Sequence, residues 1–144
     1  MVEYRSDLPQ RPARFMKLPL DERGFPVPWF VAFIDGKPDF RIVRPDGIAI
    51  AHNKRLCWIC GEPRGAYSAF VIGPMCAVTR TTSEPPSHRE CAEFAVKACP
   101  FLTRPMAKRD ATDYPADALA PAGFHLDRNP GATALWIARG FEQF

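Results

Sequence analysis

Two short motifs contain the side chains of this chain that are best suited to chemistry. The first is Cys57-x-x-Cys60, followed directly by Gly61, and the second is His88-x-x-Cys91. Two thiolates at this spacing can reach one metal ion from a tight turn, and a glycine after the second relieves the turn because it tolerates a positive φ. On a helix, His88 and Cys91 would share a face. The four side chains therefore predict a closed site for one structural zinc ion.

Other uses of the cysteines stay open at this stage. Free cysteine behaves as a small buried apolar residue, so the spacing could be accidental. Disulfides would leave one of the five cysteines over, and no secretory signal precedes them. Cys76 and Cys99 are expected to pack in the core, although either could replace His88 as a ligand if the elements around them are placed differently.

A helix is expected to carry the second motif. Ser87 followed by Glu90 has the spacing of a capping box, and Pro100 would end the helix. An apolar face follows the helical period through the residues Cys91, Phe94, Ala95, Ala98 and Cys99. His88 and Cys91 would then lie near the helix start, where the helix dipole favours a thiolate.

A β-hairpin is expected between the two motifs. An apolar, partly β-branched run extends from Tyr67 to Ile72, Gly73-Pro74 is a turn signal, and a second short apolar run covers Met75 to Thr79. A cysteine knuckle, a hairpin and a helix with two ligands in its first turn resemble the treble-clef zinc finger, over residues 57 to 99. The resemblance implies a closed site formed by four ligands, Cys57, Cys60, His88 and Cys91.

A second resemblance, which would cover most of residues 24 to 105, rests on three short runs. These runs are Cys57-Trp58-Ile59-Cys60-Gly61, Gly73-Pro74-Met75-Cys76 and Glu84-Pro85-Pro86-Ser87-His88. They are similar to a small uncharacterised protein family of bacteria and their phages. The resemblance implies no activity.

The segments around the zinc module predict an α+β fold of short hairpins and Pro-rich irregular stretches. Residues 1–28 are expected to form an extended arm, ordered in part by a few apolar side chains. Residues 29–102 would form the core, 103–122 a linker, and 123–144 a C-terminal hairpin with a turn at Asn129-Pro130-Gly131 and a strand over Ala134 to Ala138.

The core is expected to begin with a hairpin that leads into the knuckle. Residues 29–34 are continuously apolar, which is typical of a strand buried on both faces, and Asp35-Gly36 is a hairpin turn signal. Residues 39–43 would return as the partner strand. Asp46 could then cap a short helix that delivers the chain to Cys57.

The composition limits the classes of function. The 144 residues carry 19 basic and 16 acidic side chains, a net charge of +3, which permits nucleic-acid binding but does not indicate it. No apolar run has the length of a membrane span, and the N-terminus lacks the core of a signal peptide. We expect a cytoplasmic protein, in which cysteines favour zinc over disulfides.

Two enzyme classes match the motifs only in part. A zinc deaminase uses His-x-Glu, which His88 and Glu90 match, but its Cys-x-x-Cys comes second, and Cys91 is available here to close the site. A metal-dependent nuclease of the His-Asn-His type would need a histidine in the expected hairpin, and residues 67–80 contain none. Such a nuclease, or another zinc hydrolase on this frame, remains the alternative function.

Recognition of a partner is the leading hypothesis. A non-enzymatic, zinc-stabilised module would bind a nucleic acid or a protein, and the sequence indicates no small-molecule substrate. We expect its surface at the knuckle tip, where Trp58 would be surrounded by basic side chains. These are Lys54, Arg55, Arg64, Arg80 and Arg89. The alternative is that Trp58 packs in the core and the arginines are solvated or form internal pairs.

Overall fold

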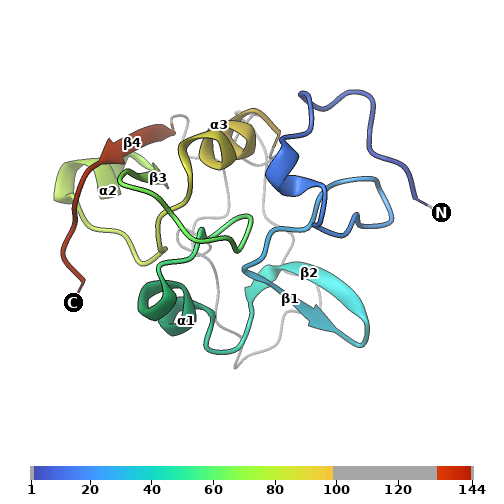
Figure 1. Ribbon diagram of the computed structural model, residues 1–144, viewed down its shortest axis with the longest axis horizontal. Helices are drawn as coiled ribbons and strands as arrows, with labels where there is room; N and C mark the ends of the chain where they lie inside the picture. The colour runs from blue at the N-terminus through green and yellow to red at the C-terminus, as the bar shows by residue number, and fades with distance from the viewer. Residues whose placement is uncertain (1, 99–132, 144) are drawn as a thin grey trace.

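In the computed structural model of the protein, residues 2–98 and 133–143 are described (Figure 1). They form a small α+β fold with two antiparallel two-stranded sheets, which confirms the expected α+β class but not the treble clef within it. In chain order the elements are the 3₁₀ helix η1 (Ala13–Phe15), β1 (Val31–Ile34), β2 (Lys37–Val43), α1 (Gly47–Lys54), β3 (Ser68–Ile72), α2 (Pro74–Thr79), α3 (Arg89–Ala98) and β4 (Ala134–Ala138).

The first hairpin, β1–β2, turns at the predicted dipeptide. Asp35 and Gly36 both have a positive φ, 51° and 79°, as the tight hairpin turn of type I′ requires. The expectation that β1 is buried on both faces is wrong. Val31 is buried, but Phe33 and Ile34 are exposed, because only the base of the hairpin reaches the core.

Helix α1 leads into the knuckle as expected, but Asp46 does not cap it. The backbone of Asp46 is left-handed, with a φ of 58°, and its side chain makes no capping hydrogen bond. Arg55, also left-handed, ends the helix. Leu56 and Pro63 then pair across the knuckle, which closes it into a short antiparallel loop.

The predicted hairpin of residues 67–79 is wrong in its second half. The run after Gly73 forms helix α2, with Pro74 in its first turn, where a missing N–H costs nothing. The partner of β3 is instead β4, paired from Ser68↔Ala138 to Ile72↔Ala134. The local hairpin that a treble clef would contain is therefore absent from residues 67–79.

The predicted strand at residues 134–138 is confirmed as β4, beside β3 at one end of the described structure (Figure 1). The rest of the expected C-terminal hairpin lies outside the described residues, including its turn at residues 129–131. The expected linker at 103–122 and Cys99 lie outside them as well.

Two small cores meet at the knuckle. In the first, Phe15 and Leu18 of the N-terminal segment pack with the knuckle and with α3, and the ring of Phe15 meets that of Phe94 edge-on at 4.9 Å between centroids. In the second, Trp58 packs with residues of β2 and α1. Consecutive knuckle residues thus contribute to both cores, which makes this loop the centre of the fold.

Within residues 2–98 and 133–143, no helix has the length and apolar character needed to cross a membrane.

Candidate metal centre

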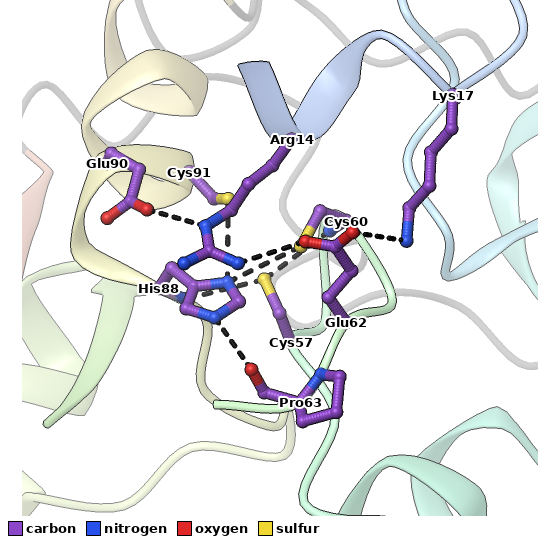
Figure 2. A network of polar contacts seen from close by, with 9 residues as sticks. All are labelled: Arg14, Lys17, Cys57, Cys60, Glu62, Pro63, His88, Glu90 and Cys91. Carbon is purple, nitrogen blue, oxygen red and sulfur yellow. Dashed lines mark hydrogen bonds and ion pairs between the residues drawn. The ribbon is translucent and has the colours of Figure 1, made fainter. Parts of the chain in front are cut away.

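The structure brings all four predicted ligands together. Cys57 and Cys60 come from the knuckle, His88 from the residue before α3, and Cys91 from the first turn of α3 (Figure 2). All four are buried, and their ligand atoms lie within 4.8 Å of one another. Among the described residues, this Cys3His group could hold a metal ion.

The distances from the imidazole suit tetrahedral coordination. His88 Nδ1 lies 3.4 Å from Cys60 Sγ and 3.8 Å from Cys91 Sγ. On a tetrahedral zinc ion with ordinary bond lengths, a sulfur and a nitrogen ligand are about 3.6 Å apart. The donor atoms therefore need little movement to bind such an ion.

The knuckle turn has the geometry that its glycine predicts. Gly61 has a φ of 76°, and its N–H donates to the carbonyl of Cys57 at 2.9 Å. The N–H of Cys60 donates to Cys57 Sγ at 3.4 Å. A Cβ at Gly61 would lie 2.5 Å from Cδ1 of Trp29, so this position needs glycine for space as well as for its backbone conformation.

The imidazole of His88 is oriented from the far side of the knuckle. Nε2 lies 2.9 Å from the carbonyl oxygen of Pro63 and donates its hydrogen to it, which leaves Nδ1 facing the sulfurs, where a metal ion would bind it (Figure 2). A carbonyl on the second nitrogen is the usual support of a metal-binding histidine. The N–H of His88 also donates to Cys57 Sγ at 3.3 Å.

The start of α3 differs from the predicted capping box. The N–H of Ser87, which a capping box would pair with Glu90, donates instead to the carbonyl of Ala69 in β3 at 2.8 Å. The carboxylate of Glu90 binds Arg14. The pairing of Ser87 with β3 fixes the position of His88 directly after it.

The three cysteine thiols shift one another's pKa values because their sulfurs lie close together. Hydrogen bonds from Cys60 and then Cys91 hold the pKa of Cys57 far below its usual value. The pKa of Cys91 is raised by its hydrogen bond to Cys57, and that of Cys60 is raised to about 11 for the same reason. A divalent cation bound among the three sulfurs would allow all three thiols to ionise.

An ion-pair network ties the N-terminal segment to both halves of the site (Figure 2). Arg14, in η1, binds Glu62 beyond the knuckle at 2.9 Å and Glu90 in α3 at 2.7 Å, and Lys17 binds Glu62 at 2.9 Å. Lys17 and then Arg14 lower the pKa of Glu62, and Arg14 lowers that of Glu90. The sequence showed basic residues in this segment, but nothing in it indicated their partners.

The expectation that Trp58 forms an exposed recognition surface is wrong. Trp58 is 3% exposed, and its ring stacks on that of Phe30 at 5.1 Å and meets that of Trp29 at 6.0 Å. The side chain that follows Cys57 points into the second core, so the knuckle tip presents no aromatic ring to solvent. The alternative reading of Trp58 as a core residue is the correct one.

The basic residues assigned to that surface have separate environments. Lys54 and Arg55 are exposed at the end of α1, and Arg89 pairs with Glu93 one turn along α3 at 2.9 Å. Arg64 is half-buried and donates to the carbonyl of Leu56 and the hydroxyl of Ser68. Arg80 lies over the ring of Trp136, 5.8 Å from its centroid.

Cys76 does not replace His88 among the candidate ligands. It lies half-buried on α2 and is not part of the four-residue group.

No family model, curated protein or solved structure matches this chain. The two family resemblances therefore stay predictions, and the case for the site depends on its own geometry.

Proposed function

We propose that this protein is a non-enzymatic binding module stabilised by one structural zinc ion. The proposal rests on the convergence of four buried protein donors, Cys57, Cys60, His88 and Cys91. Three thiolates and an imidazole are the soft sulfur and nitrogen ligands that zinc takes in tetrahedral structural sites.

A structural role is favoured over catalysis because the protein itself supplies four ligands. Catalytic zinc sites usually have three protein ligands and leave the fourth position to water or substrate. Glu90, the residue that would carry protons in a deaminase, is bound to Arg14. For the nuclease alternative, no histidine lies on β3 or α2, where a hydrolytic metal site on this frame would need one.

The metal would act by tying distant segments together. It would join the knuckle, which follows α1, to α3, on which the N-terminal segment packs through Phe15. The site is absent in the unfolded chain, so its binding energy would become folding energy.

Nucleic acid is the partner class that we propose, in preference to protein. From Arg64 to Ser83 the sequence has two arginines and no aspartate or glutamate, although the chain as a whole is only slightly basic. This stretch includes β3, α2 and the exposed Arg80, which forms no ion pair among the described residues and would be available to a phosphate.

The deciding experiment is the metal content of protein purified without added metal. We expect one zinc per chain, lost in Cys57→Ser and retained in the matched control Cys76→Ser. A folded protein without zinc would overturn the proposal. Two metals per chain, or one metal with an open position that readily takes up small ligands, would favour the hydrolase alternative.

A further inference from the structure

One face of the β3–β4 sheet carries a row of aromatic rings. Phe70 and Trp136 are direct cross-strand partners, so both side chains point to the same face. Phe141, just beyond β4, meets the ring of Phe70 edge-on at 5.4 Å. Trp136 is 40% exposed and Phe141 is 41% exposed, so both rings are partly open to solvent.

An arginine lies at each end of this row. The guanidinium of Arg80 is 5.8 Å from the centroid of Trp136, and that of Arg64 is 5.6 Å from the centroid of Phe141. Arg64, Phe141, Phe70, Trp136 and Arg80 thus follow one another across the sheet, and we call these five residues the aromatic ladder. A third pair, Arg139 over Tyr67, adds an exposed ring and charge at the edge of the same sheet.

Two exposed arginines lie beside these rings, Arg80 of the aromatic ladder and Arg139 at its edge. Within residues 2–98 and 133–143, neither Arg80 nor Arg139 forms an ion pair with a carboxylate. The stretches from Thr133 to Phe141 and from Arg64 to Ser83 contain no acidic residue, and Glu142 and Glu84 directly follow them. An exposed, uncompensated arginine beside an exposed ring matches a ligand with both a flat face and a negative charge.

We propose that the aromatic ladder binds single-stranded nucleic acid, an inference that rests on the proposed binding function and gives it a place and a ligand. Bases would stack on Trp136 and Phe141, and Arg80 would contact a phosphate. Sequence-tolerant binding of single strands combines these two elements, stacking rings and a basic track. Only unpaired bases expose their faces, so a duplex cannot use the rings.

The test uses the full-length, zinc-loaded protein and fluorescein-labelled oligothymidylate, with oligouridylate to separate DNA from RNA. Binding is followed by anisotropy at several salt concentrations and by quenching of tryptophan fluorescence. We expect the affinity to fall as salt is added. In a plot of the logarithm of the association constant against the logarithm of the salt concentration, each phosphate contacted should contribute about −0.7 to the slope. A duplex of the same length should bind more weakly.

Variants locate the site. Trp136→Ala should weaken binding about tenfold, since stacking contributes roughly 1–3 kcal/mol per base. Trp136→Phe keeps a ring for stacking and should retain most of the wild-type affinity. Arg80→Gln should weaken binding and reduce the salt slope by about 0.7. Phe33→Ala and Lys37→Gln change a more exposed ring and an exposed charge on the other sheet, and both variants should bind as the wild type does.

Several results would overturn the inference. The first is full affinity in folded Trp136→Ala and Arg80→Gln. The second is a duplex bound as tightly as the single strand. The third is oligonucleotide binding unchanged by salt, which would mean that no phosphate is contacted. If folded protein with one zinc per chain binds neither oligonucleotide, this inference is wrong, but the proposed zinc site is unaffected. If the protein folds without zinc, the proposed zinc-stabilised function is wrong, whatever the binding experiment shows.

Discussion

Cys57 is the residue on which the candidate site depends most. Its sulfur accepts hydrogen bonds from the N–H groups of Cys60 and His88 and is fully buried. We predict that Cys57→Ser gives insoluble or molten protein without zinc. Structural zinc contributes about 10–16 kcal/mol in small modules, and a domain is stable by only about 5–15 kcal/mol.

Metal analysis and near-UV circular dichroism would check this prediction. Cys76→Ser is the control, because that thiol lies outside the ligand group, and it should keep its zinc and its fold. A well-folded, zinc-free Cys57→Ser variant would contradict the site.

Gly61 gives a second prediction for a single residue. Gly61→Ala should destabilise the zinc-loaded protein by more than about 2 kcal/mol, because a left-handed backbone alone costs an L residue roughly 1–2 kcal/mol and the new Cβ would also collide with Trp29. Urea denaturation would measure the loss. Gly65→Ala is the matched control, since a Cβ there meets nothing within 4 Å, and equal stability of the two variants would refute the argument.

Between elements, the docking of η1 on α3 decides whether the N-terminal segment belongs to the core. Phe15 is 1% exposed and packs against Phe94. Phe15→Ala should therefore destabilise the protein by about 3–5 kcal/mol, as large-to-small changes in cores do. Denaturant unfolding would measure it, with Met16→Ala as the control because that neighbouring side chain is 66% exposed. Similar small effects for both would mean that the segment contributes little to stability.

For the whole molecule, removal of the metal should unfold both cores together. The knuckle supplies Cys57 and Cys60 to one core and Trp58 to the other, so its loosening affects both. We predict that a zinc chelator exposes Trp58 and shifts tryptophan emission to the red in one cooperative transition, reversed by added zinc. An unchanged emission, with only the N-terminal segment becoming sensitive to protease, would instead indicate local opening.

The sequence alone determined the parts of this protein that depend on neighbouring residues. The candidate ligand set follows from two motifs, each with its donors three positions apart, and the left-handed Gly61 follows from its place directly after the first motif. The Asp35-Gly36 turn and helix α3 are equally local, because backbone preference and side-chain period act over a few residues.

Only the tertiary structure decided the features that join distant segments. β3 pairs with β4 and not with residues 74–79, which follow it in the chain. The composition of an apolar strand does not specify its partner, and Pro74 suits the first turn of a helix. Trp58 is buried because a second core meets the knuckle, and Arg14 reaches both halves of the site only once η1 docks on α3. The aromatic ladder was likewise invisible in the sequence, since its rings and arginines come from separate segments that meet only when β4 closes the sheet.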